Sequence, residues 1–415
     1  MSILKNTIGA TVAMGVCGLA LSAQADVFNP NFAIIETHSV GAGNTAGSFA
    51  ASAMMGAKGH SNLAILPSWE SSITSQCAAA GAATIWPGNC NPTKMASALV
   101  SLTGRTWVQA TWAETDQASA MNTIVSSLKD HGSPAIVPIY GQADHWVAVN
   151  QVTATLVGTS WTINQVKFYD GGPAGGTDGG FNSYEGGLLS YGGSAWRNVY
   201  FRVLENINPA CDPCTTDPWY DRYVLMWEPP PGQEHTNLVA NFARSPGVFQ
   251  GLGSERLAQT QVWNSLTAAG INQDAAIWNA ISGGQAGRTF EVNGVTPAGD
   301  RWDYFLVPIM SDANTVTAFV QLAADDGAFE SVHVLPQPKA FRPVQRNAAQ
   351  LLARIALHPG ESLSAGILTW DPRAQTPFAK APTFPYYEFA VVDAHHQVGV
   401  VRVSFDTGAV IRSAQ

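Results

Sequence analysis

The sequence predicts an α+β fold in which one larger domain precedes two small, duplicated α/β units. The chain of 415 residues holds 39 Gly, 24 Pro and 13 Trp, a composition rich in turn formers and in aromatic residues that favour strands. Helical and strand patterns succeed one another between about residues 90 and 170, and a hairpin motif recurs in the last third. The length exceeds that of one ordinary domain, so we expect two or three domains.

Composition and charge exclude two classes of protein. Hydrophobic residues make up 46% of the chain and charged residues 12%, which is not the balance of a disordered chain. The formal net charge is -9, so a basic surface for nucleic acid is not expected.

The N-terminus has the pattern of a signal peptide. Lys5 precedes an apolar stretch over residues 8–21, and Ser22-Ala23-Gln24-Ala25 follows as a small-x-small cleavage site. The apolar stretch is too short for a confident membrane span, and no other stretch reaches spanning length. We therefore expect residues 1–25 to be removed and the protein to be periplasmic or secreted, with no membrane contact after cleavage. The cysteines that remain are Cys77, Cys90, Cys211 and Cys214.

A helix is predicted to open at Cys90-Asn91-Pro92-Thr93, with Pro92 tolerated in its first turn. Met95, Leu99 and Leu102 repeat at helical spacing, and Gly104 ends the pattern. Residues 26–70 show weak periodicity, so we expect an irregular lead-in there.

A second helix and three strands follow. The helix has one apolar face and stops before Gly132-Ser133-Pro134. The residues of that face are Met121, Ile124, Val125 and Leu128. The strand-like runs are Ala135–Tyr140, His145–Val152 and Trp161–Tyr169.

Three residues of this region have the chemistry of a nucleophilic site. Cys90 stands at a predicted helix start, where unpaired N–H groups and the helix dipole favour the reactive thiolate. His145 begins one predicted strand and Asp170 ends the next. If these strands form a hairpin bending at Val157-Gly158, His145 and Asp170 lie opposite each other to within a residue or two of register.

These residues resemble the pattern of papain-like cysteine peptidases, in particular the type that processes bacteriocin leaders and, more distantly, streptopain. The family carries a Gln, a Cys at a helix start, an amphipathic helix, Gly-x-Pro, an apolar strand, His-Trp-Val-x-Val and a later Asp. The corresponding residues here are Gln76, Cys90-Asn91-Pro92-Thr93-Lys94-Met95-Ala96, Gly132-Ser133-Pro134, His145-Trp146-Val147-Ala148-Val149 and Tyr169-Asp170. The match covers about residues 65–175.

The resemblance implies a papain-like domain that hydrolyses a peptide or protein substrate and needs no metal or organic cofactor. Carried over by position, Cys90 is the nucleophile and His145 the general base. Asp170 orients the imidazole, and Gln76 supplies an oxyanion donor. The chain departs from the family in two ways: Asn91 replaces the usual glycine, and Gln76 lies farther from Cys90 than expected.

Other readings of the same residues stay open. Cys90 could form a disulfide with Cys77 in an exported protein, and His145 could be a core histidine. The chain would then be a secreted binding or structural module. A papain-like core can also transfer an acyl group to another acceptor, as transglutaminases do. Cys211 and Cys214 have the spacing of a local disulfide, and a zinc site would need a second pair that the sequence lacks.

The last third predicts the duplicated units. Gly327 and Gly408 stand in similar hairpin sequences 81 residues apart, each after a strand rich in Tyr and Phe. We expect a papain-like domain over residues 26–245, one unit over 246–335 and a second over 336–415. The units resemble PepSY-type modules, which implies that they dock on the catalytic domain; binding of cell-envelope material is the alternative. Because no cysteine follows residue 214, we expect them to regulate or recognise rather than catalyse, with independent cores.

Overall fold

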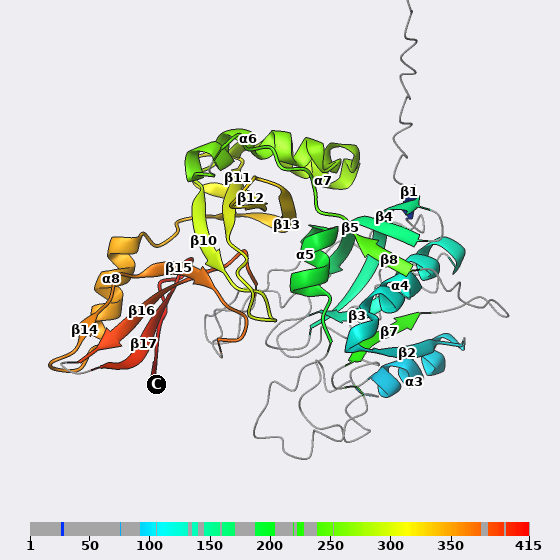
Figure 1. The fold of residues 1–415 in the computed structure, drawn as a ribbon, viewed down its shortest axis with the longest axis horizontal. Helices are drawn as coiled ribbons and strands as arrows, with labels where there is room; N and C mark the ends of the chain where they lie inside the picture. Colours follow the sequence, from blue (N-terminus) through cyan, green and yellow to red (C-terminus); the bar gives the residue numbers. More distant parts are fainter. Residues whose placement is uncertain are drawn as a thin grey trace, which may run out of the picture.

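The computed structural model describes a mixed α/β fold with a large, mostly antiparallel sheet (Figure 1). The structure describes residues 26–28, 75, 92–104, 106–131, 135–139, 145–157, 160–170, 187–203, 219, 222–227, 239–251, 253–374, 381–393 and 396–414.

The N-terminal part contains the two helices and three strands that the sequence predicts, together with further strands that it does not. Its elements are β1 (Asp26–Phe28), α3 (Pro92–Thr103), β2 (Val108–Ala113), α4 (Gln117–His131), β3 (Ala135–Ile139), β4 (His145–Val157), β5 (Ser160–Asp170), β6 (Gly187–Gly192), α5 (Gly193–Ala195), η4 (Trp196–Tyr200), β7 (Arg222–Trp227) and β8 (Val239–Phe242). The sequence does not predict the strands β1, β2, β6, β7 and β8. The strands join laterally in the order β2-β7-β3-β4-β5-β6, and every pair in that order is antiparallel.

Both predicted helices form where the apolar spacing places them. Helix α3 ends before Gly104, whose φ of 65° is in the left-handed region that glycine adopts readily. On α4, the predicted apolar face is buried, and the helix packs on β2, β3, β4 and β7. Within the described residues, no helix is both long and apolar enough to cross a membrane.

The C-terminal part contains two units, in each of which helical structure precedes five described strands; unit 1 has two α-helices there and unit 2 has one. Unit 1 comprises α6 (Glu255–Ala268), α7 (Ala275–Ile281), β9 (Gln285–Ala286), β10 (Phe290–Gly294), β11 (Tyr304–Met310), β12 (Thr315–Ala323) and β13 (Phe329–Ala340). Unit 2 comprises α8 (Arg346–Ile355), β14 (Ser362–Leu363), β15 (Ile367–Trp370), β16 (Tyr386–Val392), β17 (Gln397–Ser404) and β18 (Val410–Ala414).

The predicted duplication is visible in the strand registers. In unit 1 the β11–β12 ladder shifts register at Ile309/Met310, and in unit 2 the β16–β17 ladder shifts at Val391/Val392, the corresponding place. The next turn of each unit contains a glycine with positive φ, 71° at Gly327 and 73° at Gly408. The two short strands β9 and β14 pair with β11 and β16 respectively, so the units share one topology.

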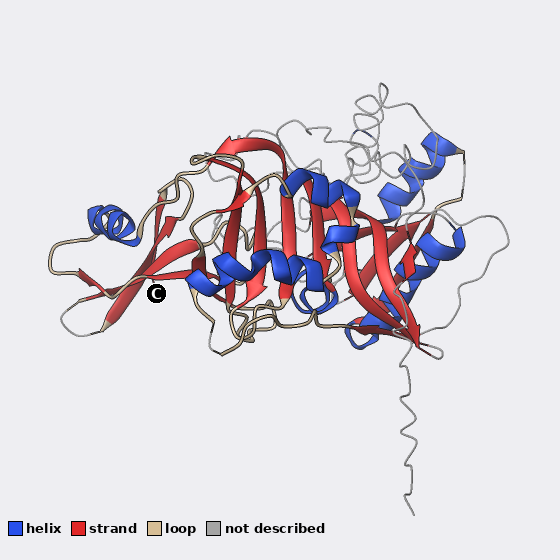
Figure 2. Ribbon diagram, turned by 90° about the horizontal axis from the view of Figure 1, so that it is seen from above, coloured by secondary structure: helices blue, strands red, loops and turns tan. Residues whose placement is uncertain are grey.

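The structure differs from the expectation that the units have independent cores. Strand β13 pairs antiparallel with β6, from Ser331 opposite Tyr191 to Val334 opposite Leu188. The side chain of Leu188 is buried among the residues that α6 and α7 cover. Figures 1 and 2 show the resulting continuous row of strands, which unit 2 extends through the parallel pair β10–β15. A boundary near residue 245 therefore cuts a shared sheet, because the interior of unit 1 completes that of the preceding domain.

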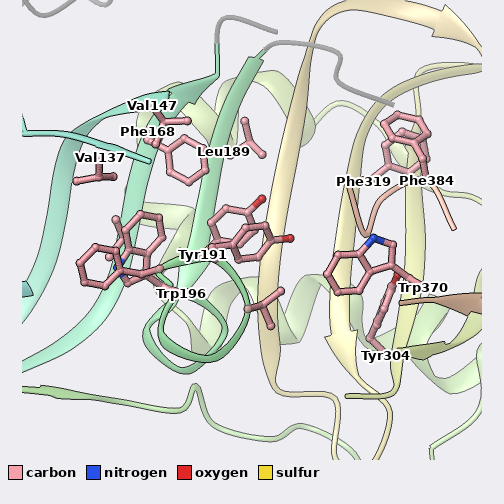
Figure 3. Close-up of a cluster of buried hydrophobic side chains, with 14 of the residues drawn as sticks. Val137, Val147, Phe168, Leu189, Tyr191, Trp196, Tyr304, Phe319, Trp370 and Phe384 are labelled. Atoms are coloured by element: carbon pink, nitrogen blue, oxygen red, sulfur yellow. The ribbon is translucent and has the colours of Figure 1, made fainter. Parts of the chain in front are cut away.

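The buried aromatic cluster crosses the same junction (Figure 3). Phe168 and Trp196 pack together on the N-terminal side, with ring centroids 5.7 Å apart. Tyr191 stacks on Tyr200 at 3.5 Å and lies beside β13. The cluster continues into the C-terminal units through Tyr304, Phe319, Trp370 and Phe384. Gly192 allows this close approach, since a Cβ there would lie 2.9 Å from the Phe329 carbonyl oxygen.

Candidate functional site and an acidic cavity

The four residues of the predicted catalytic group fall into two sets. Gln76 and Cys90 lie outside the described residues, as do Cys77, Asn91, Cys211 and Cys214. His145 and Asp170 lie in described strands, as the first residue of β4 and the last residue of β5. Their positions are fixed by backbone pairing.

Helix α3 begins at Pro92, two positions after Cys90, as the sequence predicts. The helix packs on β2 and β7, and β7 lies next to β3 through the pair Ile136–Met226. A residue just before such a helix stands near unpaired backbone N–H groups, which favour an anionic side chain.

The strand register places His145 and Asp170 near the same end of neighbouring strands. In the β4–β5 ladder Ala148 pairs with Tyr169. Continuing this register puts Asp170 opposite Val147, two residues from His145. The two positions are therefore diagonal neighbours in the ladder, and the Cα atoms of such neighbours are typically about 7–8 Å apart. The sequence predicts them directly opposite, and the structure places them within the two-residue tolerance of that prediction.

Both strands are held firmly behind these end positions. Val147 and Val149 on β4 and Phe168 on β5 are fully buried. Outside them, β3 pairs with β4 as far as Ile139 opposite His145, and β6 pairs with β5 as far as Gly187 opposite Asp170. Four antiparallel strands thus bring their ends together at this edge. An imidazole and a carboxylate on such strands can form the base and orienting groups of a nucleophilic site.

A cavity at the opposite end of β6 was not predicted from the sequence. It has a volume of about 590 Å³ and is lined by residues of α5 and of unit 1 together with Arg244 and Gly253. Glu330, the second residue of β13, lines it together with Asn198, Arg244 and Trp302. Because β6 runs from Gly187 near Asp170 to Gly192 near Glu330, the two sites are separated by about 17 Å along the strand.

Glu330 is the buried acid of this cavity, with only 5% of its surface exposed. Burial raises the pKa of Glu330 to about 7, and this effect outweighs the hydrogen bond from Trp302 and the attraction of Arg244, which lower it. Nearby Asp325 and Asp326 raise it further. The sequence offers one weak signal for this site: Glu330 is the one carboxylate in the hairpin strand Phe329–Ala340 and directly follows Phe329.

The two arginines that line the cavity are both paired with aspartates, so the cavity keeps a net negative charge. Arg244 is bridged to Asp325 at 2.8 Å and to Asp326 at 2.8 Å. Arg301 is bridged to Asp303. Glu330 and the rim residue Glu291 thus add negative charge that these bridges do not balance. Among the described residues, no group of three or more His, Cys, Asp or Glu side chains is arranged to hold a metal ion.

Comparisons with family models, with curated proteins and with solved structures give no match to this chain, so its family is not assigned by similarity.

Proposed function

We propose that the protein is an exported cysteine peptidase that hydrolyses peptide bonds through Cys90, His145 and Asp170. The observation that carries the proposal is the register of β4 and β5, which puts His145 and Asp170 near the same end of adjacent strands. The start of α3 two positions after Cys90 supports it, since a helix start favours a thiolate.

The proposed reaction proceeds in two steps. The Cys90 thiolate attacks the scissile carbonyl carbon, and Gln76 donates a hydrogen bond to the oxyanion that forms. Protonated His145 transfers its proton to the leaving amine as the C–N bond breaks, which leaves a thioester on Cys90. His145 then removes a proton from water, which attacks the thioester and releases the acid.

Asp170 acts through His145 in this scheme. A carboxylate beside the imidazole selects its tautomer and stabilises its charged form while the thiolate is present. No metal or organic cofactor takes part. In this proposal the C-terminal units bind or position the substrate protein rather than react with it.

Hydrolysis of a protein substrate by single-residue variants tests the proposal. Cys90→Ser and His145→Ala should each lower kcat by at least about a thousandfold, because each removes a group that the reaction cannot replace. Cys77→Ser is the matched control and should retain hydrolysis. If Cys90→Ser is as active as the parent, Cys90 is not the nucleophile. If Cys77→Ser is as inactive as Cys90→Ser, the loss is not specific to Cys90 and does not support its role.

The acceptor of the acyl group is tested in the same assay. A primary amine added during turnover should leave hydrolysis as the main reaction in a peptidase. If the amine instead becomes attached to the substrate carbonyl, the same three residues carry out acyl transfer.

A further inference from the structure

Glu330 is an additional residue that unit 1 contains and unit 2 lacks. In the β12–β13 ladder Phe329 pairs with Leu322 and Ser331 pairs with Gln321, so Glu330 is left between them in a bulge. The corresponding β17–β18 ladder runs without a register shift. A bulge redirects a side chain and is common beside functional sites. Here the redirected side chain lines the cavity.

Two more acids of the cavity have apolar counterparts in unit 2. Glu291 pairs with the second residue of β11, whereas Leu368 pairs with the second residue of β16. Asp303 directly precedes β11, and Pro385 directly precedes β16. The backbone carbonyl of Asp303 accepts a hydrogen bond from the turn after β12, and that of Pro385 accepts one from the turn after β17. The fold of the unit therefore does not require acids at these places.

Burying Glu330 has an energetic cost that the fold does not explain. A carboxylate removed from water without a full counter-charge destabilises the folded state. Arg244, the cation near it, already bridges Asp325 and Asp326. Such a cost is commonly retained where a group serves binding.

We propose that this cavity binds an organic cation, an ammonium or guanidinium group such as the end of a Lys or Arg side chain, with Glu330 as its counter-charge. The volume of about 590 Å³ is within the range of ligand pockets and accommodates an extended basic side chain. Trp302 lines the same cavity and donates a side-chain hydrogen bond to Glu330, so the carboxylate is held at the cavity wall. Glu291 adds negative charge at the rim. The inference is independent of the proposed peptidase activity.

Binding of the cation is linked to a proton. The groups that face Glu330 are Arg244, Asp325, Asp326 and the indole of Trp302, and their joint effect with burial is a pKa of about 7. A cation binds the ionised carboxylate, so near neutral pH it displaces the proton that Glu330 holds. Affinity should therefore rise between pH 6 and pH 8 and level off above that.

Calorimetric titration of the full-length protein with butylguanidinium and butylammonium chloride tests this proposal. At pH 8 both cations should bind, whereas sodium butyrate and butanol should not. Glu330→Gln should weaken binding at least about tenfold, the effect of losing one charged hydrogen bond. Asp406→Asn is the control for loss of one charge: Asp406 lies in the turn after β17, at the position that corresponds to Asp325 in unit 1, and this variant should bind as the parent does.

Each other outcome contradicts the proposal. It is wrong if neither cation binds the parent protein at millimolar concentration, if butyrate binds equally well, or if Glu330→Gln binds unchanged. If Glu330→Gln fails to fold, two other measurements test the proposal. These are the affinity of Glu291→Gln for the cations and the number of protons that the parent protein releases on binding, determined by calorimetry in two buffers. Unchanged affinity in Glu291→Gln together with no proton release at pH 7 would overturn it.

Discussion

Lys167 on β5 and Asp274 at the start of α7 form a buried ion pair, with 2.5 Å between the Lys167 Nζ and a carboxylate oxygen of Asp274. Their side chains are 6% and 10% exposed. The pair joins a strand of the N-terminal part to a helix of unit 1. Beside it, the Gln165 side-chain amide donates to the carbonyl of Ala269. Two polar side chains of β5, Gln165 and Lys167, thus find their partners in unit 1.

Removing one partner of this pair should destabilise the whole protein. Lys167→Met leaves the Asp274 carboxylate buried, and we expect the free energy of unfolding to fall by about 3 kcal/mol. The double variant Lys167→Met/Asp274→Ser should lose less, because Ser removes the buried charge and still caps α7. Urea unfolding measures both. If the double variant loses as much as the sum of the two single variants, the pair is not coupled.

A chain that ends near residue 245 should not fold independently. It loses the β13 partner of β6, which pairs over Ser331 to Val334, and leaves Gln165 and Lys167 without partners from unit 1. Circular dichroism melting should show no cooperative transition for this chain and a sharp one for the full-length protein. A cooperative melt of the shortened chain near the full-length Tm would instead support separate domains.

Glu330 should make stability fall as pH rises. Its folded-state pKa is raised to about 7 from an ordinary value of 4.5. As pH rises, Glu330 therefore ionises at a lower pH in the unfolded chain than in the folded protein. The stabilisation that the protonated carboxyl gives the folded state is fully present below pH 4.5 and is lost as pH rises through 7. The expected loss is about 3 kcal/mol. Urea unfolding at pH 5 and pH 8 should show it in the parent and not in Glu330→Gln. Equal pH dependence in both proteins would contradict the buried, raised carboxylate.

Asp170→Asn should lower kcat by about a hundredfold or more and leave the melting temperature unchanged, because Asp170 orients His145 at the end of β5. Asp116→Asn, at an exposed position, is the control for loss of one charge. The kcat and the melting curve of each variant are the measurements. Hydrolysis by Asp170→Asn at the parental rate would reduce Asp170 to a turn residue.

The elements of the N-terminal part could be predicted because their apolar spacing is local. The apolar residues from Met121 to Leu128 repeat at helical spacing and are buried on α4, and the three apolar runs that follow form strands. The hairpin register was predicted two residues away from its observed value. Two bulges, at Asn150 on β4 and Asn164 on β5, shift the register in opposite directions and leave no net change. The two-residue difference arises because the turn, between Val157 and Ser160, lies one residue later than predicted. Turn placement depends on the packing of both strands.

The union of the two parts could not be predicted from the sequence. The β6–β13 pairing joins residues more than a hundred positions apart, and no local pattern in β6 specifies its second neighbour. The repeat itself was predicted from the spacing of Gly327 and Gly408, and in the structure both glycines have a positive φ. The bulge at Glu330 escaped prediction because it appears only when the two ladders are compared.

The most direct test of the proposed function is the rate at which iodoacetamide alkylates Cys90 between pH 5 and pH 9, followed by mass spectrometry of the Cys90 peptide. We expect Cys90 to be a free thiol that reacts at pH 6 at least about tenfold faster than an ordinary cysteine, with this advantage lost in His145→Ala. A Cys77–Cys90 disulfide in active protein would contradict the account. So would a Cys90 that reacts with an ordinary pKa of about 8.5 whether or not His145 is present.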